Sequence, residues 1–143
     1  MKNSMLILVA ALTLFLVSCD NEPARPPSED IREEIAGDWY CELNDGDSTM
    51  PFEVTITLDP DNENQILISN FHSTGVEAYA IVYEDNTIEL PAQDLGVSGT
   101  SVKRSTNIVI SDGFDRIDWE YEATDQTGTY TAIVTFILGD ISK

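Results

Sequence analysis

Carboxylates are the most abundant side chains in this sequence that could take part in chemistry, and three of them stand at alternate positions. Asp118, Glu120 and Glu122 would share one face of a strand. Such a ladder can hold a cation, or raise the pKa of one member by like-charge repulsion. The residues that alternate with them are Ile117, Trp119 and Tyr121, which are typical of a core face. We therefore expect the ladder to be the solvated outer face of a strand, with cation binding as the alternative.

A second acidic group resembles the opening of a calcium loop. Asp59, Asp61 and Glu63 occupy alternate positions, as the first ligands of such a loop do. The full pattern then needs a glycine and a closing glutamate, where this sequence has Asn64 and Asn70. We expect an acidic hairpin turn, with loose calcium binding by the three carboxylates as the weaker alternative.

The other catalytic patterns are missing. His72 is the sole histidine, which removes a histidine-built zinc site or facial triad. The segment Gly96-Val97-Ser98-Gly99 lacks the spacing of a nucleophile elbow. A glycosidase needs two separated carboxylates, a condition that a chain with 26 acids always meets. We therefore expect no enzymatic activity and no cofactor.

The N-terminus predicts export. The apolar run at residues 5–17 is shorter than the roughly 20 residues that span a bilayer, and its basic start is typical of a secretory signal. Leu16, Val17, Ser18 and Cys19 resemble the lipobox of bacterial lipoproteins. The resemblance implies cleavage before Cys19 and a diacylglycerol on its sulfur. The alternatives are an ordinary signal with an accidental cysteine, or an uncleaved anchor.

Three regions follow from this interpretation. Residues 1–18 are the signal peptide, residues 19–30 are the lipidated cysteine with a disordered tether rich in proline and acid, and residues 31–143 are one folded domain. The protein is then exported and lipid-anchored to the cell envelope. We expect the outer membrane, on its periplasmic side or at the cell surface.

The charge of the chain limits its partners. The formal net charge of the whole chain is −19. Removal of residues 1–18 takes away one basic residue, Lys2, and makes the charge more negative. Nucleic acids are recognised through clustered basic residues, and Lys103 with Arg104 is the single adjacent basic pair. Nucleic acid is therefore excluded as a partner, and the lipid on Cys19 must supply the attachment to the membrane.

Cys41 is the one cysteine left if Cys19 is lipidated. It shares a strand face with Trp39 and Leu43, where a thiol packs as a small apolar group. We expect it to be buried, with a reactive thiol as the alternative.

The remaining pattern is that of an all-β domain. Residues 28–37 predict a short helical turn capped by Ser28 and ended by Gly37. Short strands with tight turns then leave no room for crossover helices, so the sheet must be an antiparallel up-and-down meander of about eight or nine strands. The predicted strands are residues 37–43, 52–58, 65–71, 76–83, 87–90, 97–103, 107–111, 117–123 and 129–138. Closing the meander into a barrel, or a half-closed barrel or sandwich, would hide its edges.

Here the chain resembles a family. Gly37 and Trp39, after a helical turn and at the start of the first strand, resemble the Gly-x-Trp motif of calycin barrels such as lipocalins. The layout of the domain is similar to small lipocalin-like lipoproteins of Bacteroidetes-type bacteria. The resemblance implies that Trp39 packs near the closed end of the barrel, often under an arginine from a late strand. The final strand has no arginine, and Arg116 lies one strand earlier.

One predicted strand is apolar on both faces. Tyr79, Ile81 and Tyr83 share one face, and the opposite face is also apolar. The second face must meet a covering loop or core layer, an apolar ligand, or a partner surface. Two functions stay open: non-catalytic binding of a small apolar or amphipathic ligand inside the barrel, or a filled domain that acts as a protein-protein interaction module of the envelope. An empty interior would favour the first function, and a filled interior the second.

Overall fold

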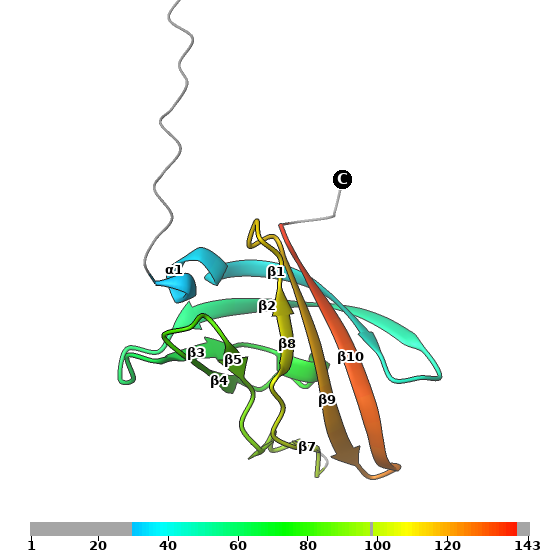
Figure 1. The fold of residues 1–143 in the computed structure, drawn as a ribbon. Helices are drawn as coiled ribbons and strands as arrows, with labels where there is room; N and C mark the ends of the chain where they lie inside the picture. Colours follow the sequence, from blue (N-terminus) through cyan, green and yellow to red (C-terminus); the bar gives the residue numbers. More distant parts are fainter. Residues whose placement is uncertain (1–29, 98, 140–143) are drawn as a thin grey trace, which may run out of the picture.

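The computed structural model describes residues 30–97 and 99–139, which form one curled antiparallel sheet with one short helix (Figure 1). The elements are α1 (Ile31–Ile35), β1 (Gly37–Asn44), β2 (Thr49–Leu58), β3 (Gln65–Ile68), a 3-10 turn η1 (Phe71–Ser73), β4 (Ala78–Val82), β5 (Ile88–Glu89), β6 (Gln93–Asp94), β7 (Ser101–Val102), β8 (Asn107–Ile110), β9 (Arg116–Asp125) and β10 (Gly128–Leu138). No helix within these residues is long and apolar enough to span a membrane. The predicted signal peptide, lipobox and Cys19 lie outside the described residues.

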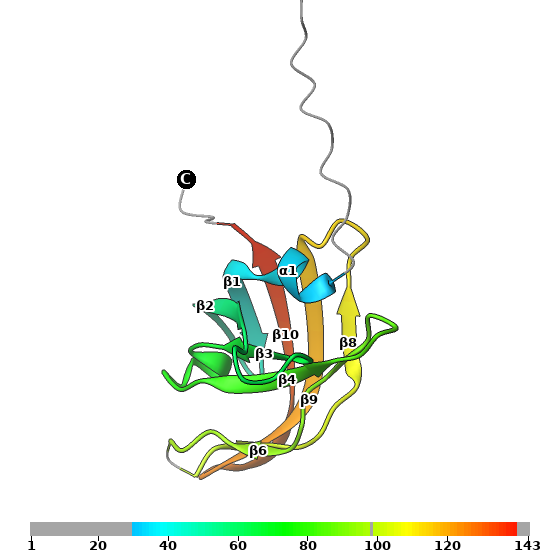
Figure 2. The ribbon, with the colours of Figure 1, turned by 90° about the vertical axis from the view of Figure 1, so that its left-hand side faces the viewer.

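The strands follow one another around the sheet, and the first strand pairs with the last. The order is β5-β4-β3-β2-β1-β10-β9-β7-β6, with β8 also on β9, and every pair is antiparallel. The β1–β10 ladder runs from Trp39 opposite Leu138 to Asn44 opposite Ile133. The predicted all-β, up-and-down meander is therefore confirmed, and its sheet curls into a half-closed barrel whose free ends are β5 and β6 (Figure 2).

The two ends of the sheet meet at a narrow seam. Leu90 and Ser105 exchange backbone hydrogen bonds of 2.9 Å in both directions. Close by, the side-chain amide of Gln93 accepts from the backbone N–H of Tyr79 at 3.1 Å and donates to its carbonyl at 2.9 Å. The two ends of the sheet are thus joined by one isolated bridge and one side chain, and not by a full ladder of backbone hydrogen bonds.

The helix α1 covers one end of the barrel. Its N-cap is Asp30, whose carboxylate accepts from the backbone N–H of Arg32 at 3.0 Å, whereas the sequence predicted a capping Ser28. The predicted cap was wrong because the helix is a single turn that begins at Ile31. Ile31 and Ile35 are buried, so the turn packs its apolar face on the barrel end.

The inner face of the sheet is filled with side chains. Trp39, Phe71, Trp119 and Phe136 are each 1 % exposed or less. Trp119 and Phe136 have ring centroids 5.2 Å apart, and Trp39 and Phe136 lie at 6.4 Å. The other large side chains with almost no exposure are Ile35, Ile56, Ile66, Ile68, Ile88, Leu90, Leu95 and Ile117. In this conformation the described interior is packed.

Two predicted strands were wrong in extent. The segment 97–103 forms a strand only at β7, because Gly96 and Gly99 adopt positive φ angles of 67° and 69° and turn the chain. On one side β7 pairs with β9, and on the other it pairs with β6, a strand that the sequence did not predict. The segment 65–71 stops pairing at Ile68, because Asn70 takes a left-handed conformation with φ 54°.

Candidate functional site

Three side chains predicted to meet a ligand or partner lie on the outside of β4. Ala78, Ala80 and Val82 occupy the buried inner face, whereas Tyr79 and Ile81 are half-buried on the outer face. Tyr83, just beyond the strand, is 43 % exposed. Their position leaves them available to a partner at the surface rather than to a ligand inside the barrel.

Tyr83 also belongs to a polar cluster that sequence reasoning missed. Its hydroxyl donates to the Glu89 carboxylate at 2.8 Å, and Arg104 donates two bonds of 2.6 Å to the same group. The guanidinium and then the phenol hydroxyl lower the pKa of Glu89 to about 2. The nearly buried carboxylate therefore stays ionised, and the cluster fastens β5 to the chain after β7.

The predicted acidic turn holds itself together. Asp59 accepts from the backbone N–H of Asp61 at 2.8 Å and from the Asn62 side chain at 2.7 Å. The carboxylate of Asp59 is thus occupied within the turn that also carries Glu63. Across residues 30–97 and 99–139, no three His, Cys, Asp or Glu side chains gather closely enough to hold a metal ion.

The carboxylate ladder of β9 lies on the outer face, as predicted. Ile117, Trp119 and Tyr121 are buried, and the carboxylates between them face outward. Arg116 donates to Asp118 at 2.8 and 2.9 Å, and Lys103 donates to Glu122 at 2.8 Å. Arg116 thus pairs on the outer face, away from the buried Trp39.

Gly37, Trp39 and Cys41 have structural roles in β1. Gly37 has a φ of 142°, which lets the chain pass from α1 into the strand. The Trp39 indole N–H donates to the Ile35 carbonyl at 2.9 Å, which locks α1 onto the barrel end. Cys41 is fully buried, as predicted, and desolvation raises the pKa of its thiol to about 12.

The opposite end of the barrel carries a buried histidine cluster. The chain of η1 brings His72 between two phenols: its Nδ1 lies 2.7 Å from the Tyr121 hydroxyl and its Nε2 lies 2.9 Å from the Tyr130 hydroxyl. His72 is 8 % exposed. Burial lowers its pKa, while the charges of Asp125 and Asp45 act weakly in the opposite direction. A neutral imidazole offers one donor and one acceptor, so it satisfies both hydroxyls.

The backbone of this segment is strained. Asn70, His72 and Ser73 have φ angles of 54°, 55° and 56°, a region that side-chain-bearing residues rarely adopt. Strain of this kind persists only where surrounding contacts enforce it, and it gathers at functional sites.

The sequence signal for the histidine cluster was indirect. Tyr121 and Tyr130 lie on inward faces, and a buried tyrosine hydroxyl needs a partner.

Phe71 closes this end of the core, next to an unpaired donor. Its ring lies 6.0 Å from Trp119, edge to face, and 5.3 Å from Tyr121. The Trp119 indole N–H is buried and has no hydrogen-bond acceptor in the described part of the chain. A buried N–H without an acceptor costs about 1 to 3 kcal/mol, so this atom is available to an acceptor that could enter.

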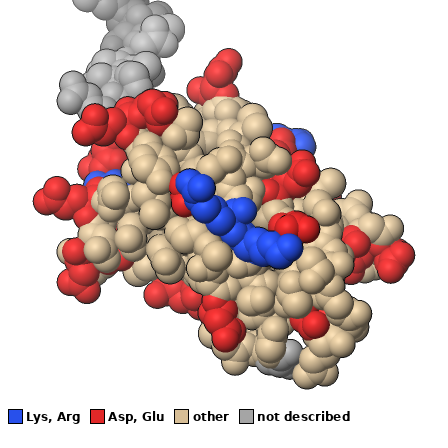
Figure 3. Space-filling view, turned by 60° about the horizontal axis from the view of Figure 1, so that its bottom comes forward, with Lys and Arg blue, Asp and Glu red and all other residues tan. Residues whose placement is uncertain are grey.

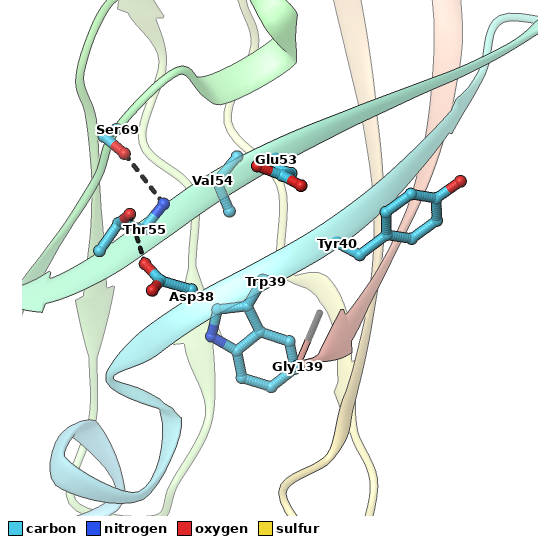
Figure 4. A pocket seen from close by; sticks show the side chains of 8 residues that line it. All are labelled: Asp38, Trp39, Tyr40, Glu53, Val54, Thr55, Ser69 and Gly139. Carbon is cyan, nitrogen blue, oxygen red and sulfur yellow. Dashed lines mark hydrogen bonds between the residues drawn. The ribbon is translucent and has the colours of Figure 1, made fainter. Parts of the chain in front are cut away.

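A hollow of about 410 Å³ lies on the outer face of β1 and β2 (Figure 4). Asp38 and Tyr40 flank the inward-pointing Trp39, and Glu53 lies opposite Tyr40 across the strand pair. Asp38 accepts from the Thr55 hydroxyl at 2.8 Å. The hollow therefore offers carboxylates, a hydroxyl and a phenol ring to a polar or cationic group.

A notch lies at the far end of the barrel, between the β1–β2 turn and the β9–β10 turn. Its volume is about 330 Å³, and its acidic lining residues are Asp45, Asp47 and Asp125. Backbone N–H groups of Ser48 and Asp47 lower the pKa of Asp45, and Thr127 lowers that of Asp125 through its hydroxyl and its N–H. Both carboxylates are therefore ionised at neutral pH.

Basic groups are scarce on this surface. Figure 3 shows a central band of Lys and Arg atoms and two smaller basic patches on a face where Asp and Glu are more widely spread. The described basic residues pair with other acids: Arg32 with Asp30, Lys103 with Glu122, Arg104 with Glu89 and Arg116 with Asp118. None of these ion pairs involves the outer hollow or the notch, so both keep their negative potential.

The comparisons with known proteins give little beyond the fold. No protein-family model matches the chain, and no curated protein matches it. Among solved structures, the chain is similar to the siderocalin Ex-FABP, which is described as functioning through dual ligand specificities. The two share 12 % identity over 74 % of this chain and 71 % of that chain, with a TM-score of 0.42. The fold assignment rests on the strand pairing of this chain itself.

Proposed function

We propose that this protein is an exported lipoprotein, anchored to the cell envelope through lipid on Cys19, whose β domain is a non-catalytic protein-protein interaction module. The observation that carries the proposal is the packed interior. Trp39, Phe71, Trp119 and Phe136 occupy the space in which a barrel would hold a ligand. Recognition then takes place on the outer surface, where the hollow and the notch lie.

Charge defines the class of partner. With a net charge of −19, the chain attracts basic proteins and repels acidic ones. A lipid anchor confines the domain to a membrane surface, so the partner is another protein that reaches that surface. Several acyl chains make such an anchor stable, since each buried methylene contributes about 0.8 kcal/mol.

Lipid attachment is tested by changing Cys19. In cells fed a labelled fatty acid, the wild-type protein should carry label and fractionate with membranes. The Cys19→Ala variant should carry none, while Cys41→Ala, the matched control, should be labelled like wild type. Label on Cys19→Ala would show that the anchor is elsewhere.

The interaction function is tested by photo-crosslinking in intact envelopes. A photoreactive amino acid replaces Tyr40 at the outer hollow, or Thr131 on β10 beside the notch, or Asp61 in the β2–β3 turn as the control. We expect defined protein adducts from at least one of the first two positions and none from Asp61. Absence of adducts from both positions would contradict a protein-binding role.

A second function is favoured by one specific observation. The unpaired Trp119 N–H next to Phe71 suggests that an apolar ligand with a hydrogen-bond acceptor replaces the Phe71 ring when η1 moves outward. Native mass spectrometry of the protein purified from its own host tests this idea. A small molecule that co-purifies with the protein, and stays bound when residues of the outer surface are substituted, would favour it. An unliganded mass for both the wild type and Phe71→Ala would remove it.

A further inference from the structure

We infer that the open edge of β10 at residues 128–132, beside the acidic notch, is a docking site for an extended basic segment of a partner protein, which adds to the sheet as a strand. The inference rests on the proposed interaction function and names its site and the chemistry of the partner.

The edge exists because β10 is longer than its neighbour. The β1–β10 ladder ends at Asn44 opposite Ile133. The β9–β10 ladder continues to Gly128 opposite Asp125. Figure 1 shows the β1–β2 hairpin turning aside while β9 and β10 run on to the far end of the barrel. Residues 128–132 therefore have a strand on one side only.

The register shows which groups face the open side. The Leu138 N–H donates to Asp115, which immediately precedes β9, at 2.9 Å, and the Gly139 N–H donates to Asp38 of β1 at 3.3 Å. The pairing of β10 is continuous, without a bulge. Because amides alternate along an antiparallel strand, Thr129 and Thr131 direct their N–H and carbonyl groups to the open side. Both residues are exposed.

This edge lacks the features that normally protect an edge strand. Proteins block such edges with proline, charge or a covering loop. The first half of β2 shows that protection: Pro51 has no N–H to offer, and the Asn70 side chain donates to the Glu53 carbonyl at 2.8 Å. Residues 128–132 of β10 contain neither proline nor a charged residue. The β10 edge is thus open to a strand where the β2 edge is not.

The notch selects the charge of the incoming strand. Asp45 and Asp47 from the β1–β2 turn and Asp125 at the end of β9 all line the notch beside this edge. An added strand would project alternate side chains toward them, so lysine or arginine at alternate positions gains attraction. A second copy of the chain would bring the same aspartates together and be repelled. The occupant is therefore a basic extended segment of another protein.

The test uses the detergent-solubilised full-length protein and a synthetic peptide of alternating lysine and valine. One control peptide carries the same number of lysines in a lysine-proline-proline repeat, which keeps the charge but presents an N–H on a given edge only once in six residues, so it cannot form a ladder. Another alternates glutamate and valine. Hydrogen exchange followed by mass spectrometry reports on residues 128–132, and anisotropy of the labelled peptide reports affinity. We expect only the lysine-valine peptide to slow exchange at Thr129 and Thr131, with affinity falling as salt rises.

Two variants separate the edge from the charge. Thr131→Pro removes one N–H from the open side and should weaken binding about tenfold or more. Asp47→Asn should weaken it about threefold at low salt, while Asp61→Asn, the matched control in the β2–β3 turn, should leave it unchanged. Unchanged tryptophan fluorescence shows that each variant is folded. If Thr131→Pro fails this check, the comparison between lysine-valine and lysine-proline peptides still decides.

Each outcome has a distinct meaning. Equal binding of the two lysine peptides, or slowed exchange elsewhere, overturns strand addition at β10. Concentration-dependent protection without peptide identifies a second copy as the occupant and overturns the basic partner. If the peptide fails while envelope crosslinks form from Tyr40, the docking site is wrong and the interaction function stands. If the peptide binds as expected while no crosslinks form in envelopes, the edge is a docking site and the proposed function is wrong.

Discussion

Replacement of His72 tests whether the buried cluster governs stability near neutral pH. Burial lowers the pKa of His72 below its ordinary 6.5, so the imidazole is neutral in the folded protein. It bridges the hydroxyls of Tyr121 and Tyr130 at 2.7 and 2.9 Å. Gln is the suitable replacement, because it can donate and accept hydrogen bonds but does not titrate.

The sign and size of the effect follow from proton linkage. Below pH 6.5 the unfolded chain binds a proton at His72 that the folded chain does not, so the unfolded state gains stability as pH falls. The contribution is fully present above pH 6.5 and is lost toward the lower folded pKa. At pH 5.5, one unit below 6.5, the loss is at most about 1.4 kcal/mol.

Urea unfolding of the detergent-solubilised protein, followed by fluorescence of the buried Trp39 and Trp119, measures the free energy of unfolding from pH 7.5 to 5.5. Carboxylates contribute less in this window, because their ordinary pKa values lie near 4. The wild type should lose up to about 1.4 kcal/mol relative to His72→Gln. An NMR titration that places the pKa of His72 at or above 6.5, or equal pH profiles for both proteins, would refute the reasoning.

Three further predictions concern the rest of the domain. Cys41, buried and with its thiol pKa raised to about 12, should resist a thiol reagent in the native protein and react once urea unfolds it; native labelling would contradict its burial. Asp30→Ala should lower the free energy of unfolding by about 1 kcal/mol through loss of the helix cap, measured against Asp47→Asn as a surface control. Millimolar calcium should leave the melting temperature unchanged, because the Asp59 carboxylate is occupied by its own turn; a rise that Asp59→Asn abolishes would restore a calcium site.

The strands could be predicted where apolar and polar residues alternate in the sequence and the apolar ones are buried in the fold. Residues 52–58 and 117–123 alternate without a break, and both lie within long strands. The segment 97–103 misled because its apolar valines suggested a strand, whereas Gly96 and Gly99 set the backbone. Local periodicity cannot reveal a turn that two glycines impose.

The histidine cluster could not be predicted from local sequence patterns. His72 is 49 residues from Tyr121 and 58 from Tyr130, so only the pairing of distant strands brings them together. Similarly, the packed interior depends on how Phe71 turns inward from a loop, and no periodic pattern marks that residue. The open edge of β10 also depends on two strand lengths, which the sequence gives only to within a few residues.

The helix α1 and the notch occupy opposite ends of the barrel, so the point where the chain enters the domain is separated from the notch. If Cys19 carries lipid, eleven residues lead from it to Asp30, and a fully extended chain of that length reaches at most about 40 Å. The attachment then joins the domain at the α1 end, whereas the β9–β10 turn lies at the other end. A partner that adds to β10 therefore binds at the end of the barrel away from the point of attachment.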